Sequence, residues 1–151
     1  MNREYGLTII ELLISVAILV IILALGIIVL NPVAQFASAR NSQRRFHIES
    51  VLNSIRSNIA DTRTGVFTCS NGDIPTTTKR MASGPSNYNI APCLVPNYLQ
   101  NMPFDPSATS SYYSSVTDYN TGYDVLKNAS TGEITVSAPF AESGKTISVT
   151  R

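Results

Sequence analysis

Residues 7–30 read Leu7-Thr-Ile-Ile-Glu11-Leu-Leu-Ile-Ser-Val-Ala-Ile-Leu-Val-Ile-Ile-Leu-Ala-Leu-Gly26-Ile-Ile-Val-Leu30, and this stretch decides the fold. No side chain from Leu12 to Leu30 is charged, so a helix over this run spans a bilayer core of about 30 Å. A helix is expected because lipid offers no partner to free backbone groups. Glu11 is the carboxylate of the run, and burying it in the membrane costs about 2.5–3.5 kcal/mol. It lies at the headgroup level by chance, or it has a function.

The residues around Glu11 carry a more specific signal. The stretch Gly6-Leu7-Thr8-Ile9-Ile10-Glu11 resembles the processing site of type IV prepilins, in which a short polar leader ends in Gly and the fifth mature residue is Glu. Residues 1–6 would be the leader, and Leu7, where the family most often has Phe, the first mature residue. The resemblance implies cleavage by a prepilin peptidase between Gly6 and Leu7, N-methylation of Leu7, and a role for Glu11 in assembly.

Two other interpretations of the N-terminus stay open. The apolar run is longer than the core of a secretory signal and lacks an Ala-x-Ala site, so the alternative to a prepilin is an uncleaved signal anchor. The basic residues conflict with the motif, because Arg3 precedes the span whereas Arg40, Arg44 and Arg45 follow it. On charge alone the far side would be cytoplasmic. We give the processing motif precedence over this count.

After the span, residues 31–61 are predicted to continue as an amphipathic helix. Asn31-Pro32 is the expected break, since proline lacks a backbone donor and clashes with the preceding turn. Beyond it, apolar residues recur at helical spacing and form one face, namely Ile48, Val51, Leu52, Ile55 and Ile59. This stripe requires a partner, and the natural one is a sheet from the same chain.

Residues 62–96 are rich in Thr, Ser, Asn, Gly and Pro and are predicted to be a long surface loop between helix and sheet. Cys69 and Cys93, the two cysteines of the chain, lie toward its ends. On the oxidising side of a membrane, cysteines more often pair than stay free. A Cys69–Cys93 disulfide is therefore predicted, with two free thiols as the alternative.

Residues 97–151 are predicted to form the β-sheet head. Tyr123–Lys127 and Glu133–Ser137 flank a Gly-containing turn, which is typical of a hairpin, and Lys145–Thr150 forms a third strand. Apolar and polar residues alternate along these strands, as in an antiparallel sheet covered on one face. The fold class is therefore α+β: a long N-terminal transmembrane helix, the stem, with a C-terminal antiparallel β-sheet head, as in type IV pilins.

The middle of the chain also resembles the major pseudopilins of type II secretion. The residues concerned are Tyr98-Leu99, Pro103-Phe-Asp105-Pro106 and Gly122-Tyr123-Asp124. Those proteins carry a calcium loop in the head, but their usual Trp-Gly after Asp-Pro is replaced here by Ser107-Ala108. Asp118 and Asp124 offer hard oxygen ligands, yet two Asp six residues apart are far from a dense calcium site. We predict no metal.

Other functions have little support in the sequence. The net charge of +1 and the small cluster Arg40, Arg44 and Arg45 are insufficient for a nucleic-acid footprint, so these arginines are expected on a solvated helix face or in a subunit contact. His47, the only histidine, is expected to be an ordinary surface residue. No phosphate-binding loop or catalytic set is present, so we predict neither an enzyme nor a cofactor.

The sequence therefore predicts the subunit of a homo-oligomeric helical filament of the type IV pilus kind. A type II secretion pseudopilin is the first alternative, and a non-polymerising membrane-anchored binding module is the second. The expected partners are the membrane, the prepilin peptidase and the assembly platform proteins. Before assembly the chain would cross the bacterial cytoplasmic membrane once with its head outside the cytoplasm, and afterwards it would lie in a surface or periplasmic filament.

Overall fold

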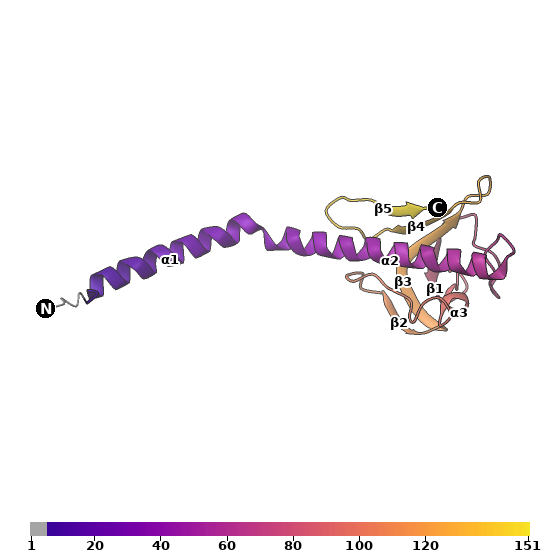
Figure 1. The fold of residues 1–151 in the computed structure, drawn as a ribbon, viewed down its shortest axis with the longest axis horizontal. Coiled ribbons are helices and arrows are strands. Elements are labelled where there is room, and N and C mark those ends of the chain that lie inside the picture. Colours follow the sequence, from indigo (N-terminus) through magenta and orange to yellow (C-terminus); the bar gives the residue numbers. More distant parts are fainter. Residues whose placement is uncertain (1–5) are drawn as a thin grey trace. The chain divides into compact units, whose positions relative to one another are not determined.

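The computed structural model describes residues 6–151, without the side chains of residues 27–30, and the chain divides into two compact units. The first unit, Met1–Phe36, contains helix α1, and the second unit, Ala37–Arg151, is called the head below (Figure 1). Five of the six leader residues expected from the sequence, residues 1–5, lie outside the described residues. The α+β fold class is confirmed.

Helix α1, Ile9–Leu30, is the predicted apolar helix. Its window Ile9–Gly26 is long and apolar enough to cross a membrane, and none of that window is buried. Asn31 then adopts a left-handed conformation, with φ 39°, and its carbonyl accepts hydrogen bonds from the N–H groups of Ala34 and Gln35. Helix α2, Pro32–Thr62, therefore begins with proline at its first position, where no N–H is needed. The break expected at Asn31-Pro32 is present, as a capped start of a new helix.

Within the head, α2 packs its apolar stripe against the sheet. Ile48, Val51, Leu52 and Ile55 are fully buried, and Ile59 packs at the edge of the same cluster. The cluster includes residues from both β4 and β5, such as Val136 and Ile147. Burying each of these aliphatic side chains contributes about 1.5–3 kcal/mol, so the stripe is the main source of cohesion between helix and sheet.

The sheet has five antiparallel strands in the order β1-β3-β4-β5, with β2 paired to β3 (Figure 1). The predicted hairpin is β3 and β4, in which Val125 lies opposite Val136, and the turn closes with the Asn128 N–H on the Glu133 carbonyl. β4 alternates buried and half-buried residues, as the sequence pattern predicted. The strands are β1, Lys79–Ala82; β2, Tyr112–Ser115; β3, Asp118–Lys127; β4, Ile134–Ala138; and β5, Ile147–Thr150.

The description of residues 62–96 as a surface loop was wrong. This segment contains strand β1 and the short helix α3, Ala91–Leu94, and it places several apolar side chains in the core. The apolar residues of the segment occur in short groups without helical or alternating spacing, so the sequence pattern did not predict these elements. The buried residues of the segment include Phe67, Ile74, Met81, Ile90 and Leu94. Strand β2 was also missed, because its sequence is mostly tyrosine and serine.

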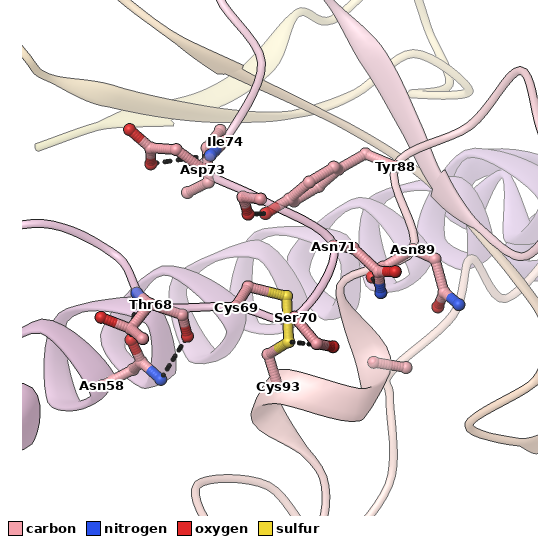
Figure 2. The surroundings of a disulfide bond; sticks show 12 residues. Asn58, Thr68, Cys69, Ser70, Asn71, Asp73, Ile74, Tyr88, Asn89 and Cys93 are labelled. Carbon is pink, nitrogen blue, oxygen red and sulfur yellow. Dashed lines mark hydrogen bonds between the residues drawn. A yellow bond between two sulfur atoms is a disulfide. The ribbon is translucent and has the colours of Figure 1, made fainter.

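The predicted disulfide between Cys69 and Cys93 is present and joins the segment after α2 to helix α3 (Figure 2). Beside it, the Asn58 side chain of α2 holds the backbone of Thr68 on both sides: its Nδ2 donates to the Thr68 carbonyl at 3.2 Å, and its Oδ1 accepts from the Thr68 N–H at 2.9 Å. The disulfide and the two hydrogen bonds of Asn58 together hold this irregular segment in place beside α2.

A group of polar side chains, which we call the arginine clasp, attaches two further loops to α2; it consists of Arg40, Asn41, Arg44, Asp105, Ser107 and Glu142. Arg44 forms two hydrogen bonds with Asp105, at 2.7 and 3.0 Å, and both side chains are fully buried. Burial acts to raise the pKa of Asp105, but hydrogen bonds from Arg44 and from two backbone N–H groups outweigh it and hold that pKa below its usual range.

The clasp also holds the loop of residues 139–146, between β4 and β5. The Glu142 carboxylate accepts hydrogen bonds from Arg40, Arg44 and Ser107, and the Asn41 side chain bonds both the N–H and the carbonyl of Glu142. The hydrogen bond from Arg40 is the main reason why the pKa of Glu142 falls to about 2. Arg44 is therefore buried and does not lie on the solvated helix face expected of it, whereas Arg40 is paired with Glu142 but stays partly exposed.

Gly122 makes room for the clasp. It has φ +74°, and a Cβ there would lie 2.3 Å from the Ser111 Oγ and 3.0 Å from the Asp105 Cβ. Without a side chain at this point, the Asp105 N–H reaches the Thr121 carbonyl of β3 at 2.8 Å. The Asp105-Pro106 turn is thus seated directly on the sheet.

We expect that replacing both cysteines by serine lowers the free energy of unfolding of the head by about 3.5 kcal/mol, from the loop-closure entropy of a 24-residue separation. Urea unfolding of the full-length protein in detergent, with and without reductant, measures this. Wild-type protein in reductant should match the variant. Equal stability of the oxidised and reduced forms would show that the bond contributes nothing.

We expect acid to weaken the clasp. Because the folded pKa of Glu142 is lowered from 4.5 to about 2, its contribution to stability is complete above pH 4.5 and is lost as the pH falls toward 2. The unfolding temperature of wild type should therefore fall more steeply between pH 7 and pH 2 than that of Glu142→Gln. Glu133→Gln is the matched control, since Glu133 is exposed and bonds only a neighbouring threonine; its curve should follow wild type. Parallel curves for wild type and Glu142→Gln would contradict this role.

Candidate functional site

Gly6 and Leu7, which flank the bond expected to be processed, precede helix α1 and are exposed. Leu7 is 71% exposed. A Cβ built at Gly6 has no atom within 4 Å among the described residues. Packing against residues 7–151 therefore does not require glycine at this position.

Thr8 is the N-cap of α1, which the sequence analysis missed. Its backbone is extended, with φ −77° and ψ 151°, and its Oγ1 accepts a hydrogen bond from the Glu11 N–H at 3.3 Å. The Thr8 carbonyl accepts the first helical hydrogen bond, from the Leu12 N–H. Thr8-x-x-Glu11 has the spacing of a capping box, and this is the signal that could have located the helix start. Residues 6–8 therefore stay outside the helix.

Glu11 lies in the first turn of α1, where the helix dipole favours a negative charge. Its side chain is exposed, and within residues 6–151 its carboxylate takes part in no ion pair or hydrogen bond. The structure thus brings Leu7, Thr8 and Glu11 together at the start of one helix. Cys69 and Cys93 are far along the chain, in the head.

The acidic residues of the head do not form a metal centre in the described part of the chain. Asp118 accepts a hydrogen bond from the Tyr112 hydroxyl at 2.6 Å, and Asp124 pairs with Arg80. No group of three or more His, Cys, Asp or Glu side chains in residues 6–151 is placed to hold a metal ion. The pair Asp118 and Asp124 is therefore engaged in contacts within the sheet.

His47 is not the ordinary surface residue that was expected. It is half-buried, and its Nδ1 lies 2.9 Å from the hydroxyl of Tyr123, a fully buried residue of β3. Burial lowers the pKa of His47 and raises that of Tyr123. The pair connects α2 to β3 through a polar contact in an apolar setting, which is a structural role.

Two shallow cavities flank α2 in the head. One, of about 360 Å³, lies between α2 and the start of β5 and is bordered by Arg45 and Lys145. The other, of about 320 Å³, lies between α2 and the segment after α3; Phe46, Tyr98 and Leu99 form its apolar border. Within the described residues no lining serine is hydrogen-bonded to Lys145 or Glu49, so neither cavity shows the paired nucleophile and base of a catalytic site.

Comparison with known proteins places the specific signal at the N-terminus. Residues 1–27 match the family model described as the prokaryotic N-terminal methylation motif. No curated protein and no solved structure matches the chain. The matched region contains Gly6, Leu7, Thr8 and Glu11 and the whole window Ile9–Gly26 that could cross a membrane. The chain thus carries the prokaryotic N-terminal methylation motif, the signature of type IV pilins and pseudopilins, on an apolar helix joined to an α+β head.

Proposed function

We propose that this chain is the structural subunit of a type IV pilus-like filament, processed by a prepilin peptidase and polymerised through helix α1. One observation carries the proposal: an exposed apolar helix has a single carboxylate in its first turn and follows a glycine at which the described residues leave room for a side chain. The matched methylation motif supports it. Leu7 would be the N-methylated first residue of the mature chain.

The apolar surface of α1 requires a covering other than water. Before assembly, the lipid of the bacterial cytoplasmic membrane would supply it, because the window Ile9–Gly26 has a suitable length and composition. The head would then lie outside the cytoplasm, where the Cys69–Cys93 disulfide is stable. In a surface or periplasmic filament, the helices of neighbouring copies would replace the lipid, with assembly platform proteins moving subunits between the two states.

Glu11 would supply specificity in this exchange. A carboxylate in an apolar setting needs an opposite charge, and the amine of a processed Leu7 on a neighbouring copy is such a group at the same depth. A contact between two different surfaces of identical subunits does not close on itself and generates an open helical array. Cleavage after Gly6 would therefore be a precondition for assembly, because it creates the amine.

A pseudopilin of type II secretion is the second candidate. It is favoured by the stretch around Asp105-Pro106 and by Gly122, which the structure brings together on β3. Both candidates share processing and polymerisation, whereas a membrane-anchored binding module would share neither. The measurement that separates the first two is the location of the filament, on the cell surface or confined to the periplasm.

We expect the chain purified from membranes of a peptidase-competent host to lack residues 1–6 and to carry one added methyl group on Leu7. Intact-mass measurement reports both changes. Gly6→Val should remain unprocessed, since a branched side chain would crowd the peptidase, whereas no atom of the described residues lies within 4 Å of a Cβ there. Gly26→Val is the matched control, because a Cβ at Gly26 also meets no atom within 4 Å. Normal processing of Gly6→Val would refute the site.

We expect Glu11→Gln and Glu11→Ala each to abolish filaments while leaving membrane insertion and head stability unchanged. The two variants separate the charge of Glu11 from the hydrogen-bonding capacity of its side chain, which Gln keeps and Ala lacks. Electron microscopy of sheared cells measures filament yield, and thermal unfolding measures the stability of the head. Filaments from Glu11→Gln but not from Glu11→Ala would show that a polar side chain suffices and that the charge is not required. Wild-type yield from both would make the carboxylate incidental.

A further inference from the structure

The cavity of about 360 Å³ between α2 and the start of β5 is lined by side chains of one electrostatic character. Two cations border it, Arg45 from α2 and Lys145 from the loop that precedes β5, and three hydroxyl residues share the border, namely Ser38, Ser42 and Thr146. Among the described residues, no aspartate or glutamate lines the cavity. The fold therefore gathers positive charge and hydroxyl groups around one hollow, from two elements that are far apart in the sequence.

The rest of the head does not neutralise these two cations. Other basic side chains, such as Arg44 and Arg80, pair with carboxylates, whereas within residues 6–151 neither Arg45 nor Lys145 forms a salt bridge. The acid nearest to Lys145 in the sequence is Glu142, and its carboxylate is already engaged by the arginines of the clasp. The cavity therefore keeps a positive charge that no group of the described chain compensates.

The arginine clasp fixes the two walls of this cavity relative to each other. Asn41, which also lines the cavity, is buried, and its side chain bonds both the N–H and the carbonyl of Glu142. The Lys145 N–H in turn donates to the Glu142 carbonyl at 3.3 Å. The loop that carries Lys145 is thus tied to the helix that carries Arg45 by contacts that use neither cation. The hollow is therefore preformed, and binding does not require the chain to bring two like charges together.

The donors around the cavity match an anion with several acceptor oxygens. Within the described residues, the hydroxyls of Ser38 and Thr146 form no hydrogen bond to the chain, so both are free to donate, whereas the Ser42 hydroxyl donates to the Ser38 carbonyl at 3.1 Å. Guanidinium, ammonium and hydroxyl donors together suit a phosphate group, which arginine binds with paired N–H groups. A volume of about 360 Å³ lies in the range of small-molecule sites and leaves room for a small group attached to the phosphate.

We propose that this cavity binds a phosphate group with a glycerol-sized substituent, held by Arg45 and Lys145 with the hydroxyls of Ser38 and Thr146. Two sources offer this chemistry, namely the headgroup of an anionic phospholipid and a soluble phosphate ester. A headgroup is within reach, because Ser38 follows Leu30, the end of the apolar run, by eight residues, which extend over at most about 28 Å. The lipid source rests on the proposed membrane span of α1, whereas the soluble source needs only the head.

Titration of the full-length protein in dodecyl maltoside tests the site. The probes are glycerol 3-phosphate and phosphatidylglycerol, with chloride at equal ionic strength and phosphatidylcholine as their controls. Calorimetry measures affinity, and native mass spectrometry counts bound lipid. We expect one molecule of at least one probe to bind each chain saturably. Arg45→Gln and Lys145→Gln should each weaken that binding at least about tenfold, because each removes a charge-assisted hydrogen bond, and the double variant should bind neither probe.

Arg56→Gln is the matched control. Arg56 is also an exposed cation of α2 but does not line the cavity, so this variant should bind as wild type does. Without a probe, every variant should unfold at the wild-type temperature, because Arg45 and Lys145 are exposed and form no salt bridge within the described chain. Loss of binding is then separate from loss of folding.

Each outcome is decisive. Binding of phosphatidylglycerol alone identifies the lipid source, binding of glycerol 3-phosphate alone identifies the soluble source, and binding of both shows that the phosphate group itself is recognised. The absence of binding by both probes would overturn the site. Equal affinity of wild type and the double variant would also overturn it, as would equal loss in Arg56→Gln, which would reduce the effect to net charge. The filament function stands in all of these cases.

Discussion

The buried ion pair between Arg44 and Asp105 is the contact on which the head is organised. Both side chains are fully buried, and the two residues are 61 positions apart in the chain. Leaving either charge without its partner would cost about 3–5 kcal/mol. The pair therefore requires α2 and the Asp105-Pro106 turn to meet in one arrangement, and Gly122 provides the space in which they do so.

The same helix makes three further contacts around this pair. Its apolar stripe from Ile48 to Ile55 packs against the sheet, and Asn41 with Arg40 holds the loop that leads to β5. At its far end, Asn58 fixes the segment that carries the disulfide. Loops with little apolar content are thus attached to one rigid element by hydrogen bonds and a covalent bond, which lets a head with a modest core hold irregular segments in place.

Helix α1 is built on the opposite principle. The head buries its apolar residues within the chain, whereas the window Ile9–Gly26 has no buried residue and depends on its surroundings for cover. Glu11 stands at the third position of this capped helix, where the helix dipole favours its negative charge. Its carboxylate makes no contact of its own within residues 6–151, because the backbone N–H of Glu11, not its carboxylate, bonds Thr8.

The sequence alone determined the elements whose residues repeat with a period. The uninterrupted apolar run specified α1, the i, i+3, i+4 stripe specified the buried face of α2, and strict alternation specified β4. The motif formed by Gly6, Leu7 and Glu11 could also be recognised in the sequence, because a motif at fixed spacing depends on no tertiary contact. The disulfide could also be predicted, since the chain contains two cysteines and both follow the predicted span.

Only the tertiary structure decided the positions whose environment is supplied by distant residues. From the sequence, Arg44 was expected to be a solvated charge and His47 a surface residue. In the structure, Arg44 is buried against Asp105, and the Nδ1 of His47 lies beside the hydroxyl of Tyr123. Strand β1 and helix α3 contain only short apolar groups without a repeating pattern, and these become core only when the rest of the head encloses them. Burial and pairing depend on neighbours that lie tens of residues away, whereas helical and strand periodicity depend on neighbours within one or two turns. That difference separates what was predicted in this chain from what was not.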